Sequence, residues 1–318
     1  MNTIYNNLEI NNYNNLLKVE GRFRCDKCKS SRKFFCYKCS CPHPEYADIV
    51  PRVELPIQID IIKHRQEVFG KSTSSHAKII SPDQVNIYEY PEIPDYSAET
   101  GDVILIFPSS KSVSISSLFK GISTFDFKEN YGLEKGFFIG TLLKKNLDEV
   151  MSDSDRERLH RNGEHDEKIY SRDNLPFKRA VFIDSTWKQC RSIYKDPRIN
   201  SIKSCVIQNR KTKFWRTQKG APDWYLSTIE AIHQFLLEVH VSAWGIHRNY
   251  YDKSLNDLEL DTSFIPPTKI FDDNDNGEKS MCKPYNGQYD NLLFFFSFLH
   301  CIIHSLDDVN GKLKMIEK

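Results

Sequence analysis

The sequence predicts an α/β fold, because short apolar runs typical of buried strands occur together with stretches of helical spacing. Residues Val103 to Phe107 form an apolar run that ends at Pro108, and Ala180 to Ile183 run directly into Asp184. Runs of this length beside polar or turn residues are typical of buried strands. The second run leads into a helical pattern, and a strand followed directly by a helix indicates α/β units.

Three stretches have the pattern of helices. After the second strand, residues of the buried face recur at helical spacing at Trp187, Cys190, Ile193 and Tyr194. The stretch from Thr228 to Val241 places one apolar stripe on a helix, formed by Ile229, Ile232, Leu236 and Val239. A third, strongly apolar stretch from Leu292 to Ile303 is too short to span a bilayer. We therefore expect a buried helix there and no membrane segment.

Composition limits the possible partners and compartments. The chain has 318 residues, and 44 Lys and Arg against 43 Asp and Glu leave a net charge of +1. Attraction to nucleic acid must therefore come from local patches. The start MNTIYNNLEI lacks the regions of a secretory signal, and nine cysteines are an odd number for disulfide pairing. We therefore expect a reducing, intracellular compartment.

The sequence suggests a short tail, a cysteine-rich module and a larger domain. Residues 1–17 are rich in asparagine, and we expect a flexible tail there. Residues 18–50 hold a cysteine cluster, and residues 51–318 hold the predicted strands and helices. Two polar stretches in the larger domain, at about 151–174 and 251–283, have the composition of solvated insertions.

Four cysteines form the strongest single motif. Cys25 and Cys28, then seven residues, then Cys36 and Cys39 give two short knuckles, each able to offer two thiolates to a tetrahedral ion. Four protein ligands leave no open position, so the spacing predicts a structural zinc site. Cys41 could replace a member of the second pair, and four reduced thiols without a metal are the other alternative.

The junction Asp184-Ser185-Thr186-Trp187 lies where a predicted strand gives way to a helix. Open α/β sheets usually place ligands at this carboxyl edge, which makes Asp184 a candidate functional residue. The alternative is structural, since Asp or Ser at such a junction caps a helix and Trp187 could belong to the core.

A second junction begins the helix that starts near Thr228. Ser227 and Glu230 have the spacing of a capping box. A capped helix start also offers free amides and a positive dipole, which suit the carboxylate of an amino-acid-like cofactor. Structural and functional roles are therefore compatible at this junction.

Between the two junctions, residues 210–216 form a basic segment in which cations and aromatic residues are mixed. Such a segment favours contacts with phosphates and unstacked bases, and a solvated basic loop is the alternative. The zinc module would extend this surface through Arg22, Arg24, Lys27 and Arg32. The residues that we expect to bind RNA are Arg210, Lys211, Lys213, Phe214, Trp215 and Arg216.

Taken together, these motifs resemble the DTW-domain family, and within it the eukaryotic tRNA-uridine aminocarboxypropyltransferases. The resemblance covers several segments in order: RKFFCYKC, KHRQEVFGKSTSSHAKII, NIYEYPEIPDY, FPSSKSVSI, IDSTWKQ, KTKFWRTQKGAPDWYLSTIEAI and GQYDNLLFFFSF. It implies a SPOUT-like fold, in which a mostly parallel sheet with flanking helices is knotted. Residues 51–318 would then form a DTW catalytic domain beside the zinc module.

The resemblance also implies a reaction. This is transfer of the 3-amino-3-carboxypropyl group from S-adenosylmethionine to N3 of a uridine in tRNA, with release of methylthioadenosine. The family suggests a D-loop uridine and a nuclear location, with the cytoplasm as the alternative. Two other functions stay open: a SPOUT-like RNA methyltransferase, and a non-catalytic zinc-containing RNA-binding protein.

Candidate catalytic residues follow from the family motifs. Asp184, Thr186 and Trp187 match the DxTW signature, with Ser185 at its variable place. Removal of the N3 proton calls for a carboxylate that accepts the proton or orients a water that does, for which Asp184 is the first candidate and Glu230 the second. Asp184 could instead contact the cofactor.

Cofactor contacts are expected from three segments, which are those around Ser109, around Thr186 and around Ser227. The family's STxEA motif is matched here by residues 227–231. Lys71, Ser72 and Thr73 depart from the Asn-Thr-Gly stretch of bacterial relatives, which leaves the contacts of that segment open. The residues expected to bind S-adenosylmethionine are Ser109, Thr186, Trp187, Ser227 and Thr228.

Overall fold

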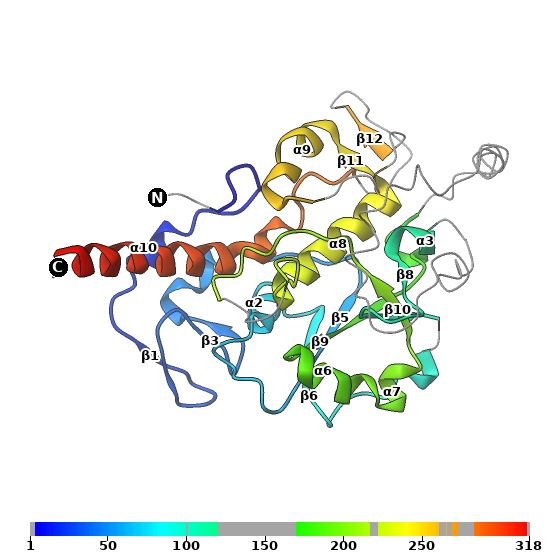
Figure 1. Cartoon of the computed structure of the whole chain (residues 1–318), viewed down its shortest axis with the longest axis horizontal. Coiled ribbons are helices and arrows are strands. Elements are labelled where there is room, and N and C mark those ends of the chain that lie inside the picture. Colours follow the sequence, from blue (N-terminus) through cyan, green and yellow to red (C-terminus); the bar gives the residue numbers. More distant parts are fainter. Residues whose placement is uncertain are drawn as a thin grey trace.

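Six parallel strands form the central sheet of the computed structural model (Figure 1). They pair in the order β6-β5-β9-β7-β10-β8, and each pairing recorded between them is parallel. Parallel strands need crossover connections, which usually place helices on the faces of the sheet. The prediction of an α/β fold with a mostly parallel sheet is confirmed.

The structure describes residues 4–99, 101–119, 170–216, 222–260, 265, 269–272 and 283–316. The strands of the main sheet are β5 (Gln58–Lys63), β6 (Val85–Glu89), β7 (Val103–Ile106), β8 (Val113–Ser114), β9 (Arg179–Asp184) and β10 (Lys203–Val206). Smaller two-stranded sheets pair β1 (Phe23–Arg24) with β2 (Ser31–Arg32), β3 (Phe35–Cys36) with β4 (Cys41–Pro42), and β11 (Ile246–His247) with β12 (Ile270–Phe271). The helices are α1 (Asn14–Leu17), α2 (Ser74–Ile80), α3 (Ile115–Phe119), α6 (Trp187–Tyr194), α7 (Pro197–Asn200), α8 (Thr228–Trp244), α9 (Arg248–Lys253) and α10 (Phe294–Ile316). Short 3-10 helices are η1 (Pro44–Ile49), η2 (Ser97–Glu99), η5 (Arg172–Asn174), η6 (Leu255–Leu258) and η8 (Asp290–Leu293).

Apolar side chains cover both faces of the sheet, as β9 shows. Ala180 and Phe182 belong to the larger core, together with residues of α2, α8 and α10. Val181 belongs to a smaller core on the other face, with residues of α6 and α7. A strand that is buried on both faces lacks polar alternation, which explains why this stretch of sequence is a continuous apolar run.

The predicted strands and helices are present. The two apolar runs form β7 and β9, and the helical patterns form α6 and α8. The apolar stretch from Leu292 to Ile303 spans the end of η8 and the first half of α10, where the aromatic side chains are buried. Among the described residues, no helix has both the length and the apolar character that a membrane crossing requires.

A buried carboxylate, Asp290, joins the N-terminal segment to α8 and α9. It accepts hydrogen bonds from Glu9 N at 2.8 Å, His233 Nε2 at 3.0 Å, Tyr250 Oη at 2.8 Å and Tyr285 Oη at 2.8 Å. Burial alone would raise the pKa of Asp290, but the interactions with His233, the Glu9 amide and Tyr250 together outweigh burial and hold that pKa below its usual value. Burial lowers the pKa of His233, so a neutral imidazole donates to an ionised Asp290.

The N-terminal segment differs from the flexible tail that its composition predicted. Within residues 4–17, the side chains of Tyr5, Leu8, Tyr13 and Leu16 are buried. The Tyr13 ring lies edge-on to Phe294 and Phe298 of α10, at centroid distances of 6.1 and 5.9 Å. The asparagines that dominate the composition separate a few large apolar side chains, and these anchor the segment.

The two predicted polar insertions are described only in part. Residues 151–169, 261–264, 266–268 and 273–282 lie outside the described residues. At the end of the first insertion, the buried Tyr170 donates from its hydroxyl to the Phe119 carbonyl at 2.7 Å. At the start of the second, Leu255 and Leu258 of η6 are buried. These edges therefore belong to the packed domain.

The packing of Tyr13 predicts that truncating it destabilises the whole domain. Replacing a buried aromatic side chain with alanine leaves a cavity and costs about 3 kcal/mol or more. We expect Tyr13→Ala to lower the free energy of unfolding by that amount in urea titrations. Glu20→Ala is the matched control, because Glu20 is exposed and should change stability by about 0.5 kcal/mol or less. An equal effect of the two variants would contradict the packing.

Candidate functional site

Asp184 lies at the carboxyl end of β9 and is held by two hydroxyl groups. Its Oδ2 accepts a hydrogen bond from Ser72 Oγ at 2.5 Å, and its Oδ1 accepts one from Thr228 Oγ1 at 2.7 Å. The side chain is only 5% exposed. The DSTW junction and the start of α8, which are far apart in sequence, therefore meet at one carboxylate.

The segment between β5 and α2 completes this edge of the sheet. Ser72 orients Asp184, and Thr73 Oγ1 accepts a hydrogen bond from Ile229 N at the start of α8, at 3.0 Å. Sequence reasoning assigned no role to these two hydroxyl residues, because they depart from the bacterial pattern. Their location directly before a helix was the signal that could have indicated them.

Charges of both signs gather beside Asp184. Lys63 is the last residue of β5 and lies opposite Asp184 in the sheet register. Burial lowers the pKa of Lys63, and the nearby carboxylates of Asp184, Glu67 and Glu89 partly offset this effect. Burial and the charge of Asp184 raise the pKa of Glu67. Perturbed groups that cluster at the carboxyl edge of a sheet are typical of functional sites.

Glu230 is fully buried and has every oxygen engaged. Its Oε2 accepts from Ser227 N at 2.9 Å and from Thr212 Oγ1 at 2.8 Å, and its Oε1 accepts from Lys213 N at 2.8 Å. The capping box that spacing predicted is present. Glu230 therefore ties the start of α8 to the segment after β10, and this geometry favours a structural role over that of a base.

Arg210 does not lie on the surface where RNA binding was predicted. It is 2% exposed, with Nη2 4.0 Å from Glu230 Oε1 and Nη1 donating to His233 Nδ1 at 3.2 Å. The basic composition of the segment concealed this burial, because a cation can enter a core when a carboxylate compensates it. Arg210 thus links Glu230 to the His233–Asp290 pair.

The other residues of the basic segment are accessible or half-buried. Lys211 and Lys213 both pair with Glu259, with the Lys211 contact at 3.7 Å. Phe214 and Trp215 are half-buried against Phe296 of α10, with centroid distances of 6.4 and 5.2 Å. Part of each ring surface is therefore packed against the core.

Arg216 and Tyr37 hold the β5–α2 segment from two sides. Arg216 Nη2 donates to the Gly70 carbonyl at 3.1 Å. The Tyr37 ring, from the cysteine module, approaches so closely that a β-carbon on Gly70 would contact its Cζ at 3.5 Å. Arg32 fixes the Tyr37 ring, since its guanidinium lies 4.0 Å from the ring centroid and donates to the hydroxyl at 2.8 Å. The cysteine module and the basic segment therefore meet next to Ser72.

The remaining predicted contacts lie on neighbouring strand ends. Ser109 follows β7, and its hydroxyl is bonded to Ser112 Oγ at 2.9 Å and to Ser204 Oγ of β10 at 2.7 Å. Thr186 is exposed and begins α6 with a capping box to Gln189. The structure brings Thr228 to Asp184, whereas the Ser227 hydroxyl donates to Glu230. Ser185 lies between Asp184 and Thr186 in the chain and is half-buried, and the Trp187 side chain lies outside the described parts.

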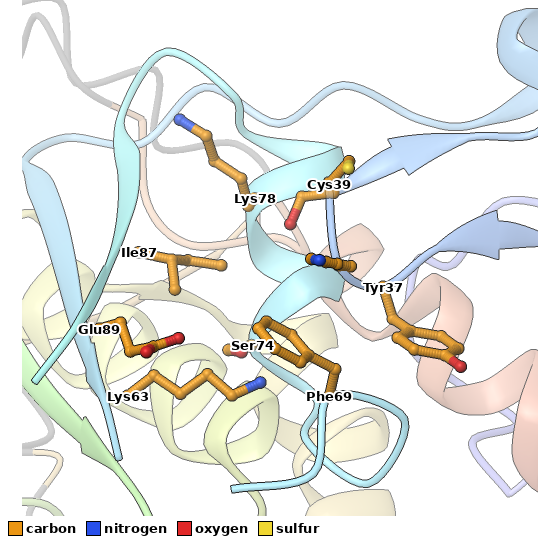
Figure 2. Close-up of a pocket in the computed structure, with 10 residues that line it drawn as sticks. Tyr37, Cys39, Lys63, Phe69, Ser74, Lys78, Ile87 and Glu89 are labelled. Carbon is orange, nitrogen blue, oxygen red and sulfur yellow. The ribbon is translucent and has the colours of Figure 1, made fainter. Parts of the chain in front are cut away.

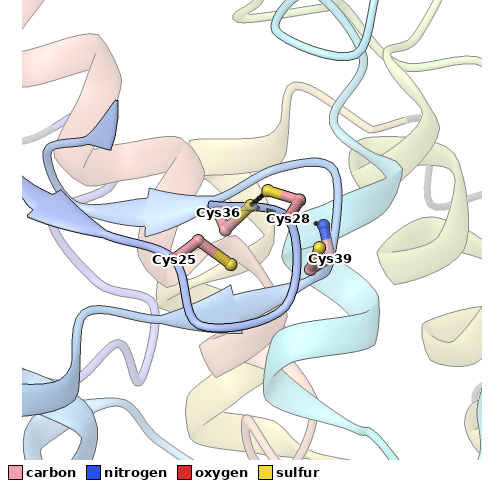
Figure 3. Close-up of side chains that lie close together, drawn as sticks. All are labelled: Cys25, Cys28, Cys36 and Cys39. Carbon is pink, nitrogen blue, oxygen red and sulfur yellow. Dashed lines mark hydrogen bonds between the residues drawn. The ribbon is translucent and has the colours of Figure 1, made fainter. Parts of the chain in front are cut away.

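The four cysteines converge on one point between the β1–β2 and β3–β4 ribbons (Figure 3). The sulfur atoms of Cys25, Cys28, Cys36 and Cys39 all lie within 4.8 Å of one another. A tetrahedral site with Zn–S bonds of about 2.3 Å sets its sulfurs about 3.8 Å apart. The Cys28–Cys36 distance of 3.5 Å is close to that value. The donor set therefore fits a structural zinc ion.

The ionisation of the thiols supports the same assignment. Hydrogen bonds from Ser30 lower the pKa of Cys28 to about 6, whereas burial and the neighbouring thiols raise the pKa of Cys39 to about 12. Negative charge on one sulfur opposes ionisation of the next, and a divalent cation among them would cancel that repulsion. Cys41 Sγ lies 3.7 Å from Cys25 Sγ but does not belong to the set of four.

A cavity of about 320 Å³ separates the cysteine module from the sheet edge (Figure 2). Its walls come from the second knuckle, the end of β5, the β5–α2 segment, α2 and β6. Lys63 extends along one wall toward Phe69, with Nζ 3.7 Å from the ring centroid. The lining residues are Tyr37, Lys38, Cys39, Ser40, Lys63, Phe69, Ser74, Lys78, Ile87 and Glu89.

The sulfur geometry predicts different roles for Cys39 and Cys41. We expect purified Cys41→Ser to keep one equivalent of zinc, and Cys39→Ser to lose most of it, as measured by elemental analysis. Loss of a structural ion also removes folding free energy, so Cys39→Ser should unfold at lower temperature. Zinc loss from Cys41→Ser with retention in Cys39→Ser would assign the fourth ligand to Cys41.

Comparison with known proteins agrees with the motifs that meet at Asp184. Among curated proteins, the chain is 37% identical to tRNA-uridine aminocarboxypropyltransferase 1 of Mus musculus, over 92% of this chain and 81% of that protein. The proteins of the same name from Xenopus laevis and Homo sapiens are each 34% identical, over 98% and 92% of this chain and 91% and 82% of theirs. No solved structure matches the chain. The model of the DTW domain matches residues 33–304, and the chain therefore belongs to the DTW-domain family.

Proposed function

We propose that this chain transfers the 3-amino-3-carboxypropyl group from S-adenosylmethionine to N3 of a uridine in tRNA. The observation that carries the proposal is the similarity, over nearly the whole chain, to relatives that are named for this activity. The edge of the sheet supports it, since Asp184 of the DxTW motif is held there by hydroxyls from two other segments. A D-loop uridine is the proposed acceptor.

Asp184 is the proposed acceptor of the N3 proton. S-adenosylmethionine supplies a γ-carbon attached to a sulfonium leaving group. The two hydroxyl donors fix the Asp184 carboxylate in one orientation and leave lone pairs on both of its oxygens. Glu230 is the weaker candidate, because it is fully buried and accepts bonds from the backbone at two points. Ser227, Thr228, Ser109 and the amides at the starts of α6 and α8 are the proposed donor contacts.

The proposed tRNA surface lies on both sides of the β5–α2 segment. Lys211, Lys213 and Arg216 follow β10, and the cysteine module contributes Arg22 and Arg24. The accessible cations would neutralise phosphates, while the half-buried rings of the basic segment offer an edge for an unstacked base. Zinc would organise the module that holds Tyr37 against Gly70.

The SPOUT-like knotted topology remains a proposal. The strand order is consistent with it, because β9 lies between β5 and β7, which both precede it in the chain. Such an order needs connections that pass over other strands, and knots are rare exceptions to the usual connection rules. An experimental structure that traces the segments after β9 and β10 would decide the topology.

Product analysis distinguishes the proposed reaction from its rival, methyl transfer. Purified protein, S-adenosylmethionine and tRNA should yield methylthioadenosine and a uridine heavier by the aminocarboxypropyl group, both detected by mass spectrometry. S-adenosylhomocysteine with a methylated nucleoside would replace the proposal with a methyltransferase. Absence of S-adenosylmethionine binding by calorimetry would leave only an RNA-binding role.

We expect Asp184→Asn to reduce product formation by about 100-fold or more, because the amide cannot accept the N3 proton. Its thermal unfolding should match the wild type, since Ser72 and Thr228 can still bond to the amide. Asp102→Asn is the matched control, because Asp102 is exposed near the opposite edge of the sheet. A raised KM for S-adenosylmethionine with unchanged kcat would instead make Asp184 a donor contact.

The surface cations predict a salt-dependent contribution to tRNA affinity. We expect the double variant Lys211→Ala, Lys213→Ala to bind tRNA more weakly and to reduce the slope of log K against log salt by about 1 to 2. Lys203→Ala, an exposed lysine at the start of β10, should change neither quantity. An unchanged slope in the double variant would remove these residues from the tRNA surface.

A further inference from the structure

The cavity between the cysteine module and the sheet edge adjoins Asp184 through hydroxyl groups. Ser74 lines the cavity, and its Oγ lies 2.6 Å from Ser72 Oγ. Ser72 Oγ in turn donates to Asp184 Oδ2 at 2.5 Å. The cavity wall is therefore only two hydroxyls away from the carboxylate that the proposed function uses.

A buried ammonium group lies in the wall of this cavity. Lys63 is 3% exposed, and Figure 2 shows its side chain directed along the wall toward Phe69. Within the described part of the chain, no carboxylate forms an ion pair with Lys63 at 4.0 Å or less. Glu89, the only carboxylate of the lining, is half-exposed and pairs with Arg65 at 3.5 Å. The Phe69 ring offsets part of the cost of burying this cation, and a ligand that brings negative charge into the cavity would offset more of it.

The other walls suit a flat heterocycle. Phe69 and Tyr37 supply aromatic rings, and Ile87 of β6 supplies an aliphatic surface. A volume of about 320 Å³ lies at the lower end of the range for small-ligand sites, about 300 to 1,000 Å³. N3 lies on the base-pairing edge of uridine, so the base must leave its stack before N3 can react. Extruded bases are held between aromatic or apolar side chains in pockets of this kind.

We infer that this cavity receives the acceptor uracil and that Lys63 contacts one of its carbonyl oxygens, where it stabilises the negative charge of the deprotonated base. The inference rests on the proposed function. The N3 proton passes to Asp184, the N3 electron pair forms a bond to the γ-carbon, and the pair of the broken carbon–sulfur bond stays on sulfur. Negative charge on the uracil oxygens, which flank N3, rises before that bond forms.

If the oxygen that Lys63 contacts is O4, the same contact would also select uracil over cytosine, because O2 is common to both bases. Uracil presents two carbonyl oxygens beside N3, and both accept hydrogen bonds from an ammonium group. Cytosine presents an amino group in place of one oxygen, and two donors would then face each other. Lys63 has no acceptor with which to satisfy that amino group.

A chemical substitution in the RNA tests the role of Lys63. Fluorine at C5 of the acceptor uridine makes N3 more acidic, so the anion needs less help from the protein. We expect Lys63→Gln to lower the single-turnover rate on uridine by about 100-fold, the usual effect of losing one donor to a developing negative charge. On the 5-fluorouridine substrate, the rate of the same variant should be only about tenfold below that of wild type.

Matched controls separate this role from a structural one. Lys178→Gln replaces an exposed lysine just before β9, at the opposite edge of the sheet, and should behave as wild type with both RNAs. Lys63→Met keeps the length of the side chain and should reproduce the behaviour of Lys63→Gln if both variants retain the wild-type melting temperature. Equal 5-fluoro effects in wild type and both Lys63 variants would overturn the inference.

Two further results distinguish the inference from the proposed function. Failure of wild-type protein to form methylthioadenosine would refute the proposed function itself. An active wild type, with a Lys63→Gln variant that binds S-adenosylmethionine at least tenfold more weakly by calorimetry, would place Lys63 in the donor site and overturn only the uracil assignment.

Discussion

The buried charge chain from Asp290 to Glu230 is the constraint on which the edge of the sheet depends. Asp290 accepts from His233, His233 accepts from Arg210, and Arg210 lies against Glu230. All four side chains are nearly inaccessible to solvent. Removing one partner of a buried charge pair costs about 3 to 5 kcal/mol of stability. This row of buried charges therefore fixes α8 against the segment after β10. It thereby also fixes the Thr228 hydroxyl that donates to Asp184.

The same logic gives the cysteine module a role in the site. Tyr37 from the module packs on Gly70, and the carbonyl of Gly70 accepts from Arg216. The β5–α2 segment, which carries Ser72, is therefore held between the cysteine module and the basic segment. A structural ion in the four-cysteine cluster, far along the chain from the DxTW motif, would thus influence the orientation of Asp184 without any contact to substrate.

Much of the fold and the main site residues could be predicted from the sequence, because they depend on local patterns. Continuous apolar runs indicated β7 and β9, and the spacing of Ser227 and Glu230 indicated the start of α8. The cysteine spacing indicated a sulfur cluster that the structure brings together. Each of these features depends on about 20 consecutive residues or fewer, which is the length over which periodicity and capping act.

The features that could not be predicted depend on partners distant in sequence. Arg210 belongs to a basic run, and only its contact with Glu230 and His233 makes it a core residue. Tyr13 lies among asparagines, and its contacts come from α10. Ser72 and Lys63 lie in the family segment of residues 63–80, which by itself assigns neither of them a role, and they gain significance from β9, with which β5 pairs. Composition describes such residues as solvated, and tertiary contacts reverse that description.

The charge pattern at the sheet edge matches the opposite demands of the proposed reaction. A sulfonium donor is cationic and is stabilised by negative surroundings, which Asp184 and Glu67 provide. A deprotonated uracil is anionic and needs a positive group, which Lys63 provides from the neighbouring strand. If Asp184, Glu67 and Lys63 all faced a single ligand, at least one of them would carry a charge of the same sign as that ligand. Lys63 lies in the cavity wall and Asp184 lies opposite it on β9, so the uracil oxygens would face the cation while N3 and the donor face the carboxylate.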